Sequence, residues 1–236
     1  MNNFDKFSLI LFSLLPISLI IGNASTNINI VLIDILFLTY CFKFKLWHWT
    51  KKNIFLHLMI LYIFLNLSSL YAYFFLIRND VGEYDGILRS LFFIKFILLV
   101  SSSTILLKNS KVLNFVYKNW LIIITIIIID IFFEKFTGKN TLGYISPDNS
   151  RIVSFFKDEL LVGALIFCFG YTSVTYFLNN QKSKNSTLLL MMMFLLIPLS
   201  VFISGERSNF VKAILLFFVI VYFLKKIKYN LNYKAL

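Results

Sequence analysis

The chain of 236 residues is too apolar for a soluble protein. Hydrophobic residues make up 59% of it and charged residues 14%, and the mean hydropathy is +0.81. Soluble domains average about 45–50% apolar and about 25% charged residues. The composition therefore excludes a soluble enzyme, a secreted disulfide scaffold and a collagen-like or disordered protein. The apolar stretches are continuous runs, which also disfavours a membrane β-barrel with its alternating pattern.

Eight apolar runs predict an all-α, polytopic integral membrane bundle that occupies residues 1–236 as a single transmembrane domain. Helices are required because lipid-exposed backbone must satisfy its own N–H and C=O groups. This holds even for the β-branched run Leu121–Ile129. Pro16 and Pro198 lie inside predicted spans, where proline bends a helix. The predicted spans are about 7–22, 28–42, 54–77, 88–107, 113–133, 158–178, 188–203 and 209–224.

The loop charges predict the orientation. With the N-terminus in the cytoplasm and alternating spans, cytoplasmic loops hold about twice as many Lys and Arg residues as the opposite loops, which follows the positive-inside rule. Both termini are then cytoplasmic. The net charge of +12 is explained by these loops, so no nucleic-acid partner is expected. A second interpretation remains for the N-terminus: the apolar run 7–21, followed by small residues up to Ser25, also resembles a cleaved signal peptide.

The arginines have a different distribution from the lysines. All four (Arg78, Arg89, Arg151 and Arg207) fall on the predicted outer side, together with most of the acids. Lysine acts as a point charge, whereas arginine offers a planar fork suited to carboxylate or phosphate. We therefore expect function on the outer face.

Two outer segments are candidates for a site. The longest outer loop, 134–157, contains Gly138, Gly143 and Pro147 and leads through Arg151 to the acids before span six. Arg151 beside aromatic residues also fits an ordinary interfacial anchor. The second segment is the turn Ser204–Asn209, where Arg207 lies at the start of span eight. A helix N-terminus next to an arginine favours an oxyanion, although a hairpin in which Arg207 pairs with Glu206 is the simpler alternative.

Ionisable residues inside the spans are few. Lys95, Asp130 and Lys212 lie close enough to a predicted outer end to reach the interface, whereas Asp34 is deeper. The chain has no HExxH motif, no glycine-rich phosphate loop and no G-x-S-x-G motif. We expect neither a metal site nor a cofactor.

Two motifs resemble the bacterial O-antigen ligase and O-antigen polymerase superfamily. The stretch Asn149–Ala164 has an arginine, paired aromatics and an acid-acid-Leu sequence that leads into a helix. The stretch Ser204–Phe210 is similar to that family's Ser-Gly-x-Arg turn between two spans. The motifs cover about 23 residues, and the topology covers most of the chain.

The resemblance implies a glycosyltransferase of lipopolysaccharide assembly in the bacterial inner membrane. Such enzymes transfer a glycan from undecaprenyl pyrophosphate, on the periplasmic face, to lipid A–core or to a second lipid-linked glycan, generally without a metal. By position, Arg151 and Arg207 would bind the pyrophosphate. Glu159 and Lys212 are weaker candidates for the wall of the same pocket.

The chain also departs from that family. Members are usually near twice this length and carry a large later outer loop, often with a histidine, whereas this sequence stops at Leu236. We therefore expect an incomplete N-terminal portion, a truncated product or a short divergent form, inactive if incomplete. The alternatives are a non-catalytic membrane partner of a polysaccharide-assembly complex, or a transporter or flippase of a lipid-linked substrate. The sequence shows no internal repeat of the kind common in transporters.

Overall fold

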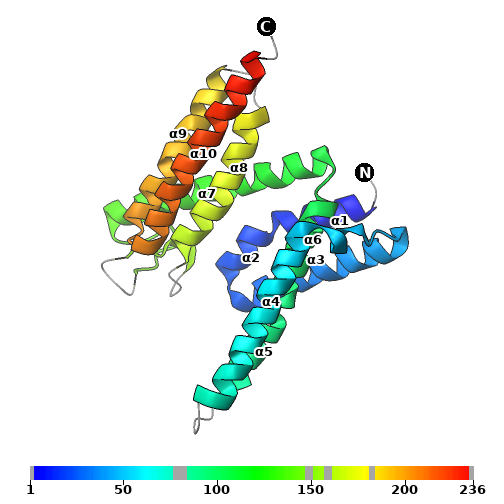
Figure 1. Cartoon of the computed structure of the whole chain (residues 1–236). Coiled ribbons are helices and arrows are strands. Elements are labelled where there is room, and N and C mark those ends of the chain that lie inside the picture. Colours follow the sequence, from blue (N-terminus) through cyan, green and yellow to red (C-terminus); the bar gives the residue numbers. More distant parts are fainter. Residues whose placement is uncertain (1–2, 77–83, 147–150, 157–160, 181–183, 234–236) are drawn as a thin grey trace. The chain divides into compact units, whose positions relative to one another are not determined.

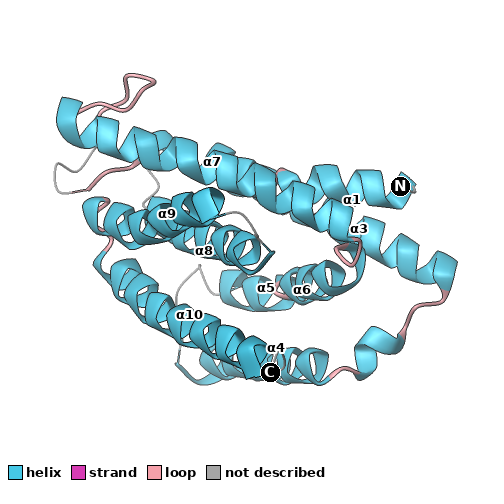
Figure 2. Ribbon diagram, turned by 90° about the horizontal axis from the view of Figure 1, so that it is seen from above, coloured by secondary structure: helices cyan, strands magenta, loops and turns pink. Residues whose placement is uncertain are grey.

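The computed structural model describes residues 3–76, 84–146, 151–156, 161–180 and 184–233. In these residues Figure 2 shows helices joined by loops and no strand, which confirms the all-α prediction. The run Leu121–Ile129 is helical as expected. By its contacts the chain divides into two compact units, and the described residues of Met1–Leu15 with Asn23–Asn114 belong to one and those of Pro16–Gly22 with Phe115–Leu236 to the other. We call them unit 1 and unit 2 and describe each by itself.

Five described helices are long and apolar enough to cross a membrane. They are Asn23–Phe44, Asn53–Phe74, Gly86–Leu106, Ser110–Thr137 and Val162–Asn180. Two consecutive helices near the N-terminus would make a sixth span if they cross together, and Thr187–Ile203 is a shorter apolar helix. The described residues therefore contain several helices that could cross a membrane, while the count of eight spans and the position of both termini remain predictions.

Unit 1 contains most of the first half of the chain. Its helices are α1 (Asn3–Ser13), α3 (Asn23–Phe44), η1 (His48–Lys51), α4 (Asn53–Tyr71), the π-helical turn η2 (Ala72–Leu76), α5 (Tyr84–Phe92) and α6 (Ile94–Leu106). Helices α3 and α6 pack along one another, and α4 packs on α5 and α6. Asn29 of α3 donates to the Leu11 carbonyl of α1 at 3.2 Å, so a polar contact joins these two helices as well.

The first predicted span is broken at Leu14. Helix α1 ends at Ser13 and α2 (Leu15–Ile21) follows after one residue. Pro16 explains the break, because proline has no N–H to donate and its ring clashes with the carbonyl four residues earlier. Pro198, by contrast, lies inside a helix that continues on both sides of it.

Unit 2 is built on helices α7 (Ser110–Thr137), η3 (Ser154–Phe156), α8 (Val162–Asn180), α9 (Lys184–Ile203) and α10 (Arg207–Tyr233). Figure 1 shows α8, α9 and α10 running alongside one another. One apolar cluster forms their shared core, and it includes four buried isoleucines of α7, namely Ile124, Ile127, Ile128 and Ile131. Tyr171 of α8 is buried in this cluster and donates to the Ala213 carbonyl of α10 at 3.1 Å.

Small residues allow the helices of unit 2 to approach closely. At Gly170 of α8 an added Cβ would lie 3.0 Å from Ile197 of α9 and 3.4 Å from Ile124 of α7. In a membrane, close backbone approach at small residues supplies packing where lipid removes the hydrophobic drive for helix association. The sequence therefore places a glycine where three helices meet.

The predicted outer loop begins too early in the sequence. It was expected over 134–157, but α7 continues to Thr137, so Glu134 and Lys135 belong to the last turns of a helix. The reason is tertiary: the Glu134 side chain accepts a hydrogen bond from the loop that follows, which favours the helical conformation at this position.

Candidate functional site

Polar side chains are buried together where four helix ends of unit 2 meet. These ends are the C-termini of α7 and α9 and the N-termini of α8 and α10, and the described loop segments 138–146, 151–156 and 204–206 lie next to them. We call this region the polar end of unit 2. Its buried polar residues are Asp130, Glu134, Asn140, Ser154, Ser204 and Glu206, each less than a tenth exposed.

Two carboxylates of α7 bind the segment around Ser154. Asp130 and Glu134 are one helical turn apart, so they lie on the same face of α7. Asp130 accepts from the Ser154 hydroxyl at 2.5 Å and from the Thr141 amide at 2.8 Å, and Glu134 accepts from the Ser154 amide at 2.8 Å. A buried carboxylate is stable only when such donors replace water. The carboxylates therefore attach the loop to the helix.

Ser154 occupies a strained backbone conformation at this contact. Its φ of +51° lies in the left-handed region, which side chains other than glycine rarely adopt. All of its polar groups are used, because Asn140 also donates to the Ser154 carbonyl at 2.7 Å. Strain of this kind persists where surrounding contacts over-determine the conformation.

Asn140 organises the turn that precedes this contact. Its side-chain oxygen accepts from the Leu142 and Tyr144 amides at 3.1 and 2.8 Å. Its own amide donates to the Tyr144 carbonyl at 2.9 Å. One buried side chain thus shapes the turn and joins it to Ser154.

Glu206 supplies the negative charge at the N-terminus of α8. Its carboxylate accepts from the Gly163 amide at 2.6 Å and from the Asn209 side chain. An added Cβ at Gly163 would lie 2.9 Å from this carboxylate, so the glycine is needed for the contact. The unpaired amides of a helix N-terminus favour an anion, and here that anion is part of the chain.

The loop with Arg151 is joined directly to the turn with Arg207. The Ile152 amide donates to the Ser204 carbonyl at 3.2 Å. The path from Arg151 to Arg207 then consists of four Cα steps and this one hydrogen bond, so their Cα atoms are no more than about 20 Å apart. The structure brings the two predicted motifs together at one end of one unit.

Arg151 lines a small polar cavity. The cavity measures about 160 Å³ and is lined by Glu134, Lys135, Gly138, Ile145, Ser146, Arg151, Ile152 and Ile203. The Arg151 side chain is exposed, whereas the Glu134 side chain is only 4% exposed. The Oε1 atom of Glu134 has no hydrogen-bond partner of ordinary geometry among the described residues, although the Val153 amide lies near this carboxylate. A cation and a buried carboxylate thus face one cavity.

Arg207 and Lys212 are exposed on α10 but do not line this cavity. Arg207 is the first residue of the helix, and its amide donates to the Gly205 carbonyl at 3.1 Å. Lys212 lies 3.5 Å from the Asn209 side-chain oxygen. The carboxylate of Glu206, which the hairpin alternative paired with Arg207, instead contacts Gly163 and Asn209. Glu159 lies outside the described residues.

Asp130 was interpreted wrongly from the sequence. It was expected to lie close enough to the outer end of its span to reach the interface, but it is 1% exposed and faces inward. Asp130 and Glu134, four residues apart, gave a usable sequence signal for a shared helix face. The role of Ser154 had no such signal, because it depends on a backbone conformation set by the fold. Glu206 was considered only as a partner for its neighbour.

Comparison of the chain with protein-family models, with curated proteins and with solved structures finds no match. Among the described residues, no group of three or more His, Cys, Asp or Glu side chains is arranged to hold a metal ion. The side chains of the candidate site are those already described at the polar end of unit 2.

Proposed function

We propose that the chain belongs to the machinery that transfers a glycan from undecaprenyl pyrophosphate, in the manner of O-antigen ligases and polymerases. The acceptor is lipid A–core or a second lipid-linked glycan, and the reaction takes place on the periplasmic face of the inner membrane. The observation that carries the proposal is the Ile152–Ser204 hydrogen bond, because it joins the two arginine segments that resemble this superfamily.

The chemistry follows from the leaving group. Transfer of the glycan breaks the bond between the anomeric carbon of the sugar and a diphosphate oxygen, and it forms a bond from that carbon to a hydroxyl oxygen of the acceptor. The acceptor hydroxyl loses its proton, and negative charge accumulates on the departing diphosphate oxygens. Donors that are already in position stabilise such charge most effectively. Arg151 and Arg207 each provide a planar, permanently charged guanidinium that can donate two parallel hydrogen bonds to one phosphate group. Lys212, exposed nearby on α10, adds positive charge to this end of the helix.

The two arginines have different settings. Arg151 faces the cavity that also contains Glu134 and Lys135, so it can bind a ligand that enters this cavity. Arg207 stands on the first turn of α10 at the surface. In this proposal one arginine contacts the phosphate next to the sugar, and the other contacts the phosphate next to the lipid.

Arginine-to-lysine exchanges test the proposal. Arg151→Lys and Arg207→Lys keep the charge but remove the bidentate fork, so glycan transfer should fall at least about a hundredfold. The matched control is Arg89→Lys in α5, which makes the same change in unit 1. Transfer is measured in nanodiscs with a lipid-linked glycan donor, and membrane insertion is checked for each variant. Normal transfer by both site variants would overturn the proposal.

Topology provides an independent test. Reporter fusions at Ile145 and at Ser208 should both report the periplasmic side, because both positions belong to the segments that meet at the polar end. A cytosolic position for either fusion would exclude a periplasmic diphosphate site.

A further inference from the structure

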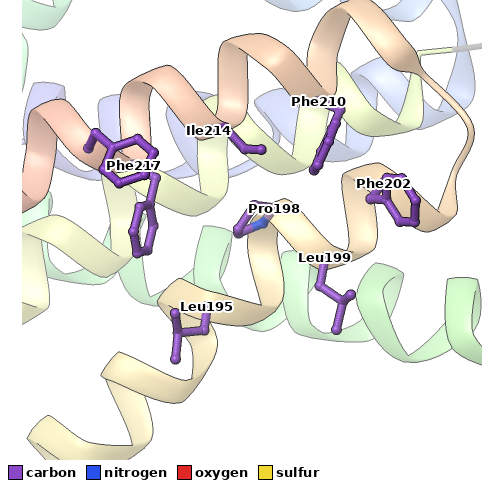
Figure 3. A pocket seen from close by; sticks show the side chains of 8 residues that line it. Leu195, Pro198, Leu199, Phe202, Phe210, Ile214 and Phe217 are labelled. Atoms are coloured by element: carbon purple, nitrogen blue, oxygen red, sulfur yellow. The ribbon is translucent and has the colours of Figure 1, made fainter.

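A groove in unit 2 and a cavity in unit 1 differ in the side chains that line them. The groove between α9 and α10, drawn in Figure 3, is lined by apolar side chains alone, among them Phe202 and Phe210. Such a lining does not distinguish one hydrocarbon from another. The cavity in unit 1 measures about 140 Å³ and has a carboxylate, a lysine and aromatic rings in its wall, so it can select a ligand by charge.

The unit 1 cavity lies where helix ends meet. Helices α1, α3 and α6 pack on one another (Figure 1). The wall of the cavity comes from the first turns of α1, the end of α3 and the turn that joins α6 to α7. Its polar and aromatic lining consists of Phe4, Asp5, Ser8, Tyr40, Lys108 and Asn109.

Asp5 is held at this cavity by a residue far along the chain. The Asn109 side-chain amide donates to the Asp5 carboxylate at 2.9 Å, and the Asn109 side-chain oxygen accepts from the Lys111 amide at 3.1 Å in the first turn of α7. A carboxylate can accept about four hydrogen bonds, so a cationic ligand can bind Asp5 in addition to Asn109. Lys108 lines the same cavity and is exposed, which makes its ammonium accessible to an anionic group.

Aromatic rings beside Asp5 already contact an ammonium group. Tyr40 lies between Phe4 and Phe44, with ring centroids 5.3 Å and 4.7 Å away. The Lys43 ammonium lies 5.4 Å from the Phe4 centroid and 5.8 Å from the Phe44 centroid. Both distances are within the range of about 6 Å over which a ring face attracts a cation. The aromatic wall is therefore suited to a primary ammonium.

The surroundings of the cavity are those of a membrane interface. Helix α3 ends at Phe44, and the exposed Trp47 follows three residues later. Tryptophan is enriched at the level of the lipid head groups. On α1, Phe7 and Ile10 are 57% and 51% exposed, so apolar surface begins within two turns of Asp5. Charged lining and lipid-facing surface thus lie next to one another.

We propose that the unit 1 cavity binds the head group of phosphatidylethanolamine. The primary ammonium of this lipid contacts Asp5 and the rings of Phe4 and Tyr40, its phosphate contacts Lys108, and its acyl chains rest on the apolar surface of α1. Phosphatidylglycerol has no ammonium for Asp5, and phosphatidylcholine has no N–H to donate. The inference is independent of the proposed function, because this site lies in unit 1 and does not involve the glycan donor.

Lipid titrations test the choice of head group. The full chain is purified in detergent and titrated with the dioleoyl forms of phosphatidylethanolamine, phosphatidylglycerol and phosphatidylcholine, and bound lipid is measured by native mass spectrometry. We expect phosphatidylethanolamine to bind at least about fivefold more tightly than the other two, since it alone can make the charged hydrogen bond to Asp5. Equal affinities, or a preference for phosphatidylglycerol, would overturn the inference.

The soluble head group separates a lipid site from a site for a small molecule. Glycerophosphoethanolamine has the same charges without acyl chains, and it should bind at least about a hundredfold more weakly, because it cannot bury hydrocarbon against α1. An affinity equal to that of the lipid would overturn the inference, since the ligand would then be a soluble compound.

Asp5→Asn tests recognition of the ammonium. The change removes the charge, keeps the size and retains an oxygen that can accept from Asn109. Affinity for phosphatidylethanolamine should fall about tenfold, while affinity for phosphatidylglycerol should stay the same and so show that the fold is intact. An unchanged preference for phosphatidylethanolamine would overturn the inference.

Lys108→Gln tests the contact to the phosphate. Both lipids carry this phosphate, so the affinity for phosphatidylethanolamine and for phosphatidylglycerol should fall about threefold or more. The matched control is Lys118→Gln, because Lys118 is an exposed lysine of α7 outside the lining of the cavity. Equal losses in the two variants would mean that lysines attract lipid without a specific site, and would contradict the inference.

Discussion

Helices α4 and α8 are both candidate membrane spans, yet they differ in their surroundings. The α4 span has a mean hydropathy of 1.8 and none of its most apolar window is buried, whereas the α8 span has a mean hydropathy of 1.3 and 44% of its window is buried. The less apolar helix is therefore the better packed one. Hydropathy measures how favourably a segment transfers into lipid. A helix that packs against other helices exposes less of its surface to lipid, so it can have a lower hydropathy.

The same contrast extends to polar side chains. The polar end of unit 2 buries several polar groups and gives most of them hydrogen-bond partners, including two backbone donors and one hydroxyl for the α7 carboxylates. In unit 1, Asp34 of α3 is buried with one oxygen that lacks a partner among the described residues, and the nearby Lys95 binds the Asn27 side chain at 2.6 Å. A networked set of polar groups is the more specific feature, and we therefore place the candidate site in unit 2.

Truncation of one leucine in each helix should break this comparison most clearly. Leu165 of α8 is 4% exposed, and Leu165→Ala should lower the free energy of unfolding by about 2–4 kcal/mol, because it leaves a cavity in the core. Leu67 of α4 is 61% exposed, and Leu67→Ala should change the free energy of unfolding by less than about 0.5 kcal/mol. Unfolding in detergent micelles measures both. Equal losses would mean that α4 has packing partners that its exposure does not reveal.

Asp130→Ala should have the next largest effect. The change leaves the Thr141 amide and the Ser154 hydroxyl without their acceptor inside the protein, and each unsatisfied buried donor costs about 1–3 kcal/mol. Protease should then cut within the segment 138–146 before the protein unfolds globally, and limited proteolysis followed by mass spectrometry measures this. Asp5→Ala in α1 serves as the control, since it removes an aspartate from unit 1. Unchanged protection of the segment in Asp130→Ala would refute the structural role of this carboxylate.

Gly163→Ala tests the contact between α8 and Glu206. The added methyl group would lie 2.9 Å from the carboxylate, so the Gly163–Glu206 hydrogen bond must lengthen. Overpacking of this kind costs about 1–3 kcal/mol. Gly86→Ala in α5 is the matched control, because nothing lies within 4 Å of its added Cβ. The apparent melting temperature should fall for the first variant only, and a fall in both would point to the helix backbone instead.

Ser154→Ala should give the smallest of these losses. The change removes one hydrogen-bond donor to Asp130 but retains the hydrogen bond from the Ser154 backbone amide to Glu134, so the expected cost is about 1–2 kcal/mol. Ser154→Gly removes the same hydroxyl but relieves the φ of +51°, and it should therefore be less destabilising than the alanine variant. Thermal unfolding distinguishes them. A glycine variant less stable than the alanine variant would show that the backbone strain is unimportant.

Much of the helical architecture was readable from the residues. Each predicted span contains helix in the structure, because long apolar runs have no other way to satisfy their backbone in lipid. The prediction was less accurate at the ends of helices. Hydropathy falls where Glu134 and Lys135 follow one another, so it placed Glu134 in a loop, whereas the helix continues to Thr137 and the Glu134 carboxylate accepts a hydrogen bond from the Ser154 amide.

The sequence by itself determined an all-helical chain with several apolar spans, and it identified two segments with arginines. These properties depend on composition and on neighbours along the chain, so they can be read locally. Only the tertiary structure decided that the two segments are joined through Ile152 and Ser204, that Asp130 and Glu134 face inward, and that Glu206 belongs to α8. Hydrogen bonds between residues 20 to 52 positions apart depend on how helices pack, and residue type alone does not specify that packing.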